Sequence, residues 1–174
     1  EYSTSGDSYT GHMMLPAFTT DETLLCRAEA YALLKQYDKS ATDIDAWQKA
    51  FTKNTTTLTK ESINDFYATL NYYTPEDIAN PSVKKKLNPT FSVEPGIQEN
   101  MIHCILHARR ILTLEEGLRW QDIKRYGIVI YRRYFEGNKL VRITDTLPVD
   151  DPRRAVQLPS NVITAGMKPN PRND

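Results

Sequence analysis

The chain has 174 residues, enough for one domain that buries roughly 70% of the surface of its unfolded form. Lys plus Arg and Asp plus Glu both number 22, so there is no net charge to recruit nucleic acid or an anionic membrane. No run approaches the ~18 apolar residues that cross a bilayer, and two cysteines are too few for a disulfide framework or a zinc cage.

Residues 1–18 are expected to form a lead-in loop, because they are rich in Ser, Thr, Gly and Tyr and their apolar end is interrupted by Pro16. The chain opens at Glu1 with neither a methionine nor a signal peptide, so we expect its natural N-terminus to lie upstream. A lipid anchor at Cys26 is rejected, since a lipobox requires a small residue before the cysteine and Leu25 is not small.

The first helix is predicted over residues 21–36. Thr19 followed three residues later by Glu22 is a capping-box pattern that typically starts a helix. Apolar residues fall on two faces of this helix, so we expect it to pack between neighbours, with Cys26 as a buried small hydrophobe.

A second helix is predicted over residues 39–51, after a tight turn at Tyr37-Asp38, with an apolar stripe of Ile44, Trp47 and Phe51. The pair, AEAYALLKQYDKSATDIDAWQKAF, resembles one tetratricopeptide-type helical hairpin. Such hairpins bury their apolar faces by stacking, so their partners must be other helices of this chain or residues upstream.

Thr59 is expected to cap a third helix, whose repeating apolar positions are Ile63, Phe66, Tyr67 and Leu70. The following segment, 71–94, is broken by prolines, although Thr74-Pro75-Glu76-Asp77 is a pattern that can open a short helix. The run Lys84-Lys85-Lys86 is interpreted as solvated.

The strongest helix is predicted over residues 97–115, with one apolar stripe that has Cys104 at its middle as inert core. His103 and His107 have a metal-ligand spacing, but no HExxH carboxylate accompanies them and two arginines follow. We interpret them as surface histidines on the polar side, and predict no metal site.

The stretch EEGLRWQDIKRYG, residues 115–127, predicts a charged turn of helix between two glycines. The i,i+3 spacings of Arg119–Asp122 and Asp122–Arg125 predict an Arg–Asp–Arg ladder beside a partly buried Trp120. The residues beyond alternate as in a β-hairpin, with strands over 128–135 and 139–144. The proline-rich tail, 145–174, is expected to be extended coil.

Catalysis is not indicated, because the sequence contains no Gly-rich phosphate loop, no GxSxG motif and no acid–base pair set for glycoside cleavage. We therefore predict no enzyme and no cofactor. Sugars are held by aromatic faces and by amides. The best local candidates lie in the proline-broken loop and are Tyr72, Tyr73, Asn71 and Asn80. The alternative is that both tyrosines pack against the end of the third helix.

Three stretches resemble the SusD/RagB-like nutrient-binding lipoproteins of Bacteroidetes outer membranes: the AEAY helix, RRILTLEEGLRWQDIKRYG, and the tail with AVQLP and NPRN. The motif residues are Gly117, Arg119, Trp120, Asp122, Lys124, Arg125 and Gly127. One departure is Leu112, where the family often has a further acidic residue.

The resemblance implies a mostly α SusD-like fold: a tetratricopeptide-type hairpin, a long helix, one small β-hairpin and an extended tail that wraps back over the helices. It implies that residues 1–174 form one domain, the C-terminal portion of a longer protein. That protein would sit at the cell surface on an N-terminal lipid outside this chain. It would pass glycans or other nutrients to a TonB-dependent, SusC-like transporter, without catalysis. The alternative is a tetratricopeptide-type interaction module without a small ligand.

Overall fold

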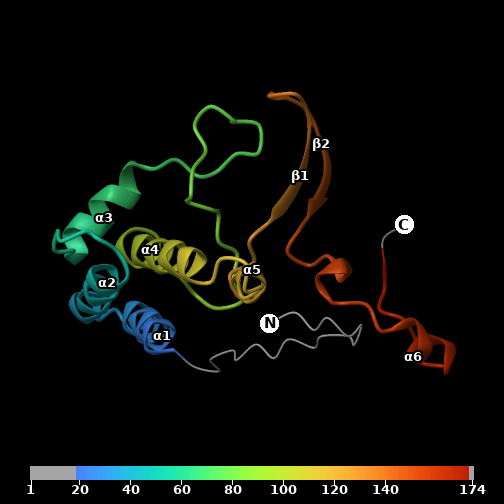
Figure 1. The fold of residues 1–174 in the computed structure, drawn as a ribbon, viewed down its shortest axis with the longest axis horizontal. Helices are drawn as coiled ribbons and strands as arrows, with labels where there is room; N and C mark the ends of the chain where they lie inside the picture. Colours follow the sequence, from blue (N-terminus) through green and yellow to red (C-terminus); the bar gives the residue numbers. More distant parts are fainter. Residues whose placement is uncertain (1–18, 173–174) are drawn as a thin grey trace, which may run out of the picture.

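The computed structural model describes residues 19–172, so the lead-in loop predicted for residues 1–18 lies outside the described part (Figure 1). Within it the fold is mostly helical with one antiparallel two-stranded sheet, as predicted. The elements are α1 (Thr20–Leu33), α2 (Tyr37–Phe51), α3 (Lys60–Thr69), α4 (Ile97–Leu112), α5 (Arg119–Arg125), β1 (Ile130–Glu136), β2 (Lys139–Leu147), the 3-10 turn η1 (Pro152–Arg154) and α6 (Ser160–Thr164).

Both predicted caps start their helices, although among the described residues Thr19 makes only the side-chain bond of the capping box predicted for it. Thr19 Oγ1 accepts the amide hydrogen of Glu22 at 3.3 Å, and Thr59 exchanges two hydrogen bonds with Ser62 in a capping box. The expected turn at Tyr37-Asp38 is wrong, because these residues already begin α2. The chain reverses two residues before Tyr37, at Lys35, which has a φ of +61°.

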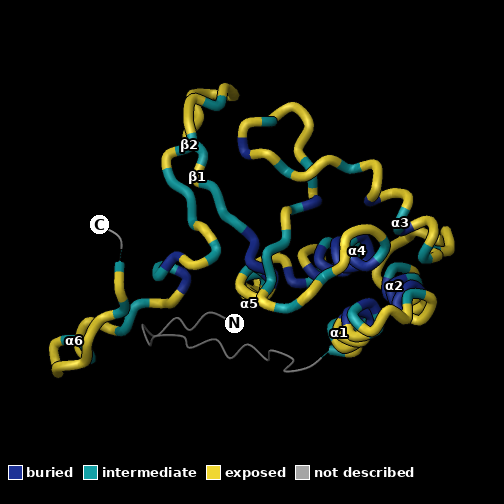
Figure 2. The backbone as a smooth tube through the Cα atoms, turned by 180° about the vertical axis from the view of Figure 1, so that it is seen from behind, coloured by how far each residue is buried: buried dark blue, intermediate teal, exposed yellow. Residues whose placement is uncertain are grey.

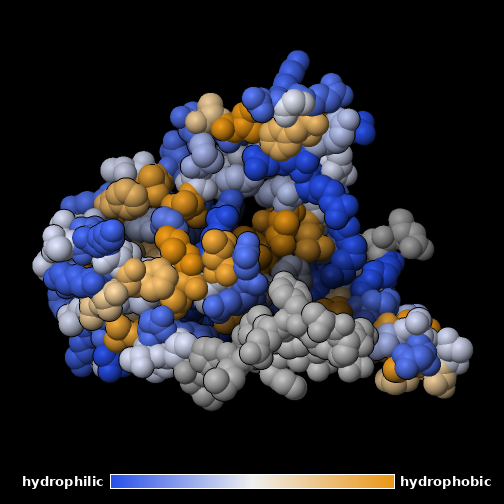
Figure 3. Space-filling view, in the orientation of Figure 1, coloured by the Kyte–Doolittle hydropathy of each residue, from blue (hydrophilic) through white to orange (hydrophobic). Residues whose placement is uncertain are grey.

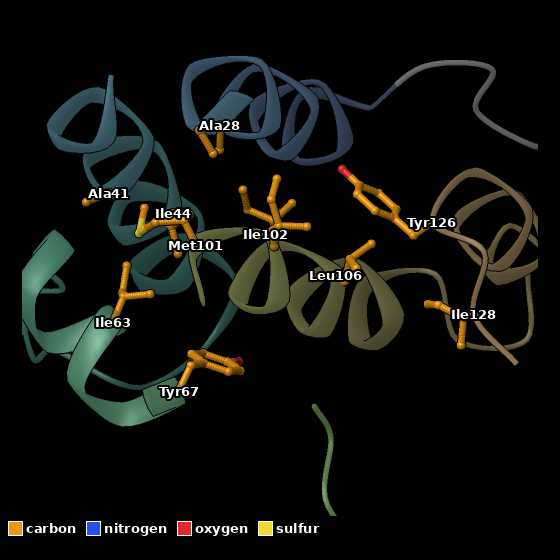
Figure 4. Close-up of a cluster of buried hydrophobic side chains, with 12 residues drawn as sticks. Ala28, Ala41, Ile44, Ile63, Tyr67, Met101, Ile102, Leu106, Tyr126 and Ile128 are labelled. Carbon is orange, nitrogen blue, oxygen red and sulfur yellow. The ribbon is translucent and has the colours of Figure 1, made fainter. Parts of the chain in front are cut away.

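Helix α4 is the central element, packed against α1, α2 and α3 (Figure 4). The α1–α2 hairpin therefore covers its apolar side with helices of this chain. The main core comprises Ala28, Ala32, Ala41, Ile44, Ile63, Tyr67, Met101, Ile102, Ile105, Leu106, Tyr126 and Ile128. Buried residues are concentrated in this helical body, whereas the β1–β2 hairpin and the tail are mostly half-buried or exposed (Figure 2).

The apolar surface of α1 is buried on one side only, because α2 and α4 lie on that side. Cys26 is exposed, so its prediction as a buried hydrophobe is wrong. Cys104 packs against the main core as predicted, and burial raises the pKa of its thiol to about 12. It is therefore an un-ionised, unreactive thiol at neutral pH.

The loop between α3 and α4 rises above α4 beside the hairpin (Figures 1 and 2). No helix forms at Thr74-Pro75-Glu76-Asp77; a single turn is closed by a 3.3 Å bond from the Asp77 amide to the Thr74 carbonyl. The lysine run is not uniformly solvated. Lys84 is buried, and its Nζ donates to the Tyr67 carbonyl and to Asn100 Oδ1 at 2.8 and 3.2 Å.

The tail is more regular than the predicted coil, because β2 continues to Leu147 and two short helical segments follow. Arg154 anchors its beginning, since this buried guanidinium donates to the carbonyls of Pro148 and Ile128, both at 2.6 Å. Helix α6 stands apart from the α1–α4 body in both views, in contrast to the expected wrapping (Figures 1 and 2). No helix in residues 19–172 is long and apolar enough to cross a membrane.

Candidate functional site

A charge cluster, buried except for Arg125 at its edge, joins three helices that are distant in sequence. It consists of Glu29 from α1, Arg109 from α4, Asp122 and Arg125 from α5, and Tyr126 directly after α5. Arg109 lies at its centre, with Nη2 donating to Glu29 Oε2 and Nη1 donating to Asp122 Oδ1, both at 2.6 Å. Glu29 Oε1 accepts from Arg125 Nε at 2.9 Å and from the Tyr126 hydroxyl at 2.6 Å.

Every charge in this cluster has an opposite charge in contact. Burial alone would raise the pKa of Glu29, but the Arg109 charge and the hydrogen bonds from Tyr126 and Arg125 bring it below its ordinary value. Burial likewise disfavours the Arg109 cation, yet Asp122 and Glu29 raise its pKa above the ordinary value. Burial and the Glu29 carboxylate raise the pKa of Tyr126, so its hydroxyl stays a donor. Glu29 and Arg109 thus keep their charges inside a hydrogen-bonded structural unit in which Tyr126 is neutral (Figure 4 shows the Tyr126 hydroxyl directed toward α1).

The predicted Arg–Asp–Arg ladder is half correct. Arg119 Nη1 lies 3.7 Å from Asp122 Oδ2, and Trp120 is partly buried, as expected. Arg125 instead bonds Glu29, and the shortest contact of Asp122 is with Arg109. Local spacing cannot identify these partners because they lie 96 and 13 residues away. The available signal was a glutamate on the apolar face of α1, between Ala28 and Ala32.

The two glycines of the motif are required by backbone conformation. Gly117 has a φ of +77° in open surroundings. Gly127 has a φ of +55°, and a methyl group there would overlap the carbonyl of Asn88. This close approach of the two backbones allows two hydrogen bonds: Asn88 donates its amide to the Tyr126 carbonyl at 2.8 Å and its Nδ2 to the Gly127 carbonyl at 3.1 Å. Gly127 therefore holds the loop between α3 and α4 (residues 70–96, called the long loop below) against the end of α5.

The two predicted ligand tyrosines face different neighbours. Tyr72 is 43% exposed and donates its hydroxyl to Glu99 at 2.5 Å; burial, with Glu99, raises its pKa to about 12. The ring of Tyr73 faces Lys85 Nζ at 2.8 Å and lies 6.4 Å from the ring of Tyr131 on β1. These contacts involve α4, the loop and the hairpin.

The two predicted ligand amides are exposed in the same loop. The backbone carbonyl of Asn71 accepts from Ser82 Oγ at 2.6 Å, and the amide of Asn80 donates to Asp77 Oδ1 at 2.9 Å. Among residues 19–172, these interactions do not connect either asparagine side chain to the tyrosine rings. The four residues therefore share a loop, while a ligand pose that uses all of them stays a prediction.

The prediction that both histidines are surface residues is wrong. His103 is only 3% exposed, its ring is 6.3 Å from that of Tyr67, and burial lowers its pKa to about 4. His107 is partly buried, with Nδ1 3.0 Å from the Tyr67 hydroxyl. Both are drawn inward because the long loop and α3 cover this side of α4. Within residues 19–172, no group of three or more His, Cys, Asp or Glu side chains is arranged to hold a metal.

An open groove of about 460 Å³ runs between α1 and α5, beside the charge cluster. Its apolar residues include Ala30, Leu33 and Leu118, and exposed Cys26 borders it with Sγ 3.9 Å from Arg109 Nη2. Four of the charged residues that line it, Glu29, Arg109, Asp122 and Arg125, are already paired with one another.

Comparison with known proteins yields no assignment: no family model, curated protein or solved structure matches this chain.

Proposed function

We propose that this chain is the C-terminal portion of a SusD-like lipoprotein that binds glycans or other nutrients at the outer-membrane surface, without catalysis. It would hand its ligand to a TonB-dependent, SusC-like transporter. The observation that carries the proposal is the charge cluster. Glu29 of the AEAY stretch bonds Arg109, Arg125 and Tyr126 of the RRILTLEEGLRWQDIKRYG stretch. Two of the three stretches behind the resemblance therefore meet in one largely buried unit.

The ligand surface in this proposal is the loop beside the hairpin. Tyr72 offers a partly exposed ring, and Tyr73 with Tyr131 forms an aromatic pair between the loop and β1. Aromatic faces of this kind stack on the C–H groups of sugar rings, while cations and amides bond the hydroxyls. The neighbouring Lys85 and the exposed Asn71 and Asn80 supply such groups.

Native gels cast with a panel of soluble polysaccharides test this proposal. We expect one glycan to retard the wild-type chain and the double variant Tyr72→Ala/Tyr73→Ala to lose the retardation. Tyr134→Ala is the matched control, because Tyr134 on β1 is also exposed, at 44%, and lies outside the loop. Unchanged retardation of the double variant would contradict the assignment of the loop. No retardation by any glycan would contradict a glycan site in this chain.

A tetratricopeptide-type interaction module is the second candidate, favoured by an apolar groove at the end of the α1–α2 hairpin. Trp47 and Phe51 stack there with centroids 5.1 Å apart, and Phe51 is 45% exposed. The face shown in Figure 3 also carries apolar patches over the helical body. Tandem 34-residue helical repeats upstream in the gene product would favour this candidate. A gene for a TonB-dependent transporter beside this one would favour the first.

A further inference from the structure

A narrow basic cavity lies on another side of α4 from the charge cluster. The long loop, α4, the start of α5 and the segment before β1 each contribute to its wall. We call it the basic cavity; its lining residues are Val83, Lys85, His103, Leu106, His107, Arg110, Arg119 and Ile128. The four residues from α4 fall at i, i+3, i+4 and i+7, which places them on one face of the helix.

The cavity gathers cations without matching carboxylates. Within residues 19–172, Lys85 and Arg110 have no carboxylate within 4.0 Å. Among the described residues, the only carboxylate near Arg119 is that of Asp122 at 3.7 Å, and Arg109 already binds Asp122 at 2.6 Å. The other nearby carboxylate is Glu99, 3.5 Å from His103, and it accepts the Tyr72 hydroxyl.

Two polar groups of this wall are also unsatisfied. His103 Nε2 and Arg119 Nη1 are buried and make no hydrogen bond among the described residues; each has only a long contact with a carboxylate, 3.5 Å to Glu99 Oε1 and 3.7 Å to Asp122 Oδ2. Leaving such groups unpaired costs free energy, more so for a charged one. Burial, followed by repulsion from Arg110, Arg119 and the nearby Arg133, lowers the pKa of Lys85 to about 8. Burial and the same two arginines of the wall lower the pKa of His107. An anion in the cavity would both accept hydrogen bonds from the unsatisfied groups and reduce the repulsion among the cations.

The size of the cavity limits what enters it. The space inside is about 10 Å³, which corresponds to roughly one water molecule or one oxygen atom. A sugar ring is therefore excluded, but one oxygen of a charged group fits, with the remaining oxygens at the mouth. Half-buried Lys85 and exposed Arg110 line the cavity with long side chains that can follow a ligand. Tyr73 lies directly outside, since its ring faces Lys85 Nζ.

We propose that the basic cavity is an oxoanion site that takes a sulfate or phosphate group, with one oxygen inside and the others held by Lys85, Arg110 and Arg119. The group comes either from a free anion or from a charged saccharide. The saccharide source rests on the proposed function and would make acidic glycans its substrate class, with the sugar ring outside on Tyr73. The oxoanion site itself does not depend on that function.

Calorimetric titration of the 174-residue chain with sodium sulfate, at constant ionic strength set with sodium chloride, tests the site. The wild type is expected to show saturable 1:1 binding, and Lys85→Gln/Arg110→Gln to bind roughly tenfold more weakly or worse, because two charge-assisted contacts are lost. The matched control is Lys53→Gln/Lys86→Gln, which removes the same charge from two exposed lysines and should keep its affinity within about twofold.

Absence of saturable sulfate binding by the folded wild type, or equal weakening by both double variants, would overturn the proposal. Arg110→Gln alone is the second test, because its exposed position leaves the fold unaffected and a loss of affinity is still expected. Thermal unfolding of each variant without sulfate establishes that it is folded before titration.

Repeating the titration with dextran sulfate and with neutral dextran distinguishes a charged saccharide from a free anion as the natural ligand. Tighter binding of dextran sulfate than of sulfate per sulfate group, lost in Lys85→Gln/Arg110→Gln, supports an acidic glycan. Binding of inorganic sulfate alone supports a free-anion site. Failure of every glycan in the native gels, together with sulfate binding that needs Lys85 and Arg110, would refute the proposed function and leave the oxoanion site standing.

Discussion

Arg109 and Arg110 are neighbours on α4, yet they lie in opposite electrostatic surroundings. Arg109 is 8% exposed and bonds two buried carboxylates, Glu29 and Asp122. Arg110 is exposed and lines the basic cavity, where it meets further cations and, within residues 19–172, no carboxylate within 4.0 Å. One helix thus separates a compensated charge cluster from an uncompensated one.

The difference indicates what each cluster is for. A buried ion pair with good geometry still brings little net stability, but removing one member leaves an uncompensated buried charge at high cost. The charge cluster therefore fixes how α1, α4 and α5 dock. A group of like charges without partners lowers stability by itself, so its presence points to a ligand that supplies the missing charge.

The largest effect is expected from breaking the compensated cluster at its centre. Arg109→Gln leaves Glu29 and Asp122 without their shared cation, and we expect the free energy of unfolding to fall by about 3–5 kcal/mol. Urea denaturation measures this. The neighbouring Arg110→Gln is the control and should stay within about 0.5 kcal/mol of the wild type. Similar losses in both variants would remove the distinction between the two clusters.

An intermediate effect is expected from Glu29→Gln, and it depends on pH. The pKa of Glu29 is below its ordinary value of 4.5 in the folded chain, so its carboxylate stabilises the fold above that pH. We expect the free energy of unfolding at pH 7 to be about 2 kcal/mol higher for the wild type than for Glu29→Gln, because the variant loses the anion that faces Arg109 and Arg125. The difference should shrink as the pH falls through the folded pKa.

Denaturation series at pH 7, 5, 4 and 3 give this difference directly, and subtraction cancels the titration of the other carboxyl groups. Glu94→Gln is the control, since the Lys35–Glu94 pair is half exposed, with both side chains at 55%, and should contribute less than about 1 kcal/mol. A difference for Glu29 that is the same at every pH would mean that the carboxylate is not ionised in the fold.

The sequence predicted the elements well because their signals are local. Thr19 and Thr59 mark helix starts through their own caps, and the alternation after Gly127 marks the hairpin. The connection at Lys35 was missed, because a non-glycine residue at positive φ has no reliable composition signal.

The sites were predictable only in part, because they depend on contacts across the fold. The motif 115–127 identified Asp122 and Arg125 but not Glu29, which comes from α1. The lysine run looked solvated, although Lys84 is buried among acceptors that only the folded chain brings together. His103 was likewise predicted to be exposed on the polar side of its helix, but it is buried in the folded chain.

The smallest effect is expected in the uncompensated cluster and has the opposite sign. Lys85→Met should raise the free energy of unfolding at pH 7 by up to about 1 kcal/mol, because it removes a half-buried cation that faces other cations. The pKa of Lys85 is about 8 in the fold and ordinarily 10.5, so the wild type regains stability between these pH values and the advantage of the variant disappears. Denaturation at pH 7, 9 and 10.5 measures this, with the exposed Lys86→Met as control. Millimolar sulfate at pH 7 should stabilise only the wild type and so cancel the advantage of Lys85→Met. A variant less stable than the wild type at pH 7 would show that the contact of Lys85 Nζ with the Tyr73 ring outweighs the repulsion from the neighbouring cations, and the contrast with the charge cluster would fail.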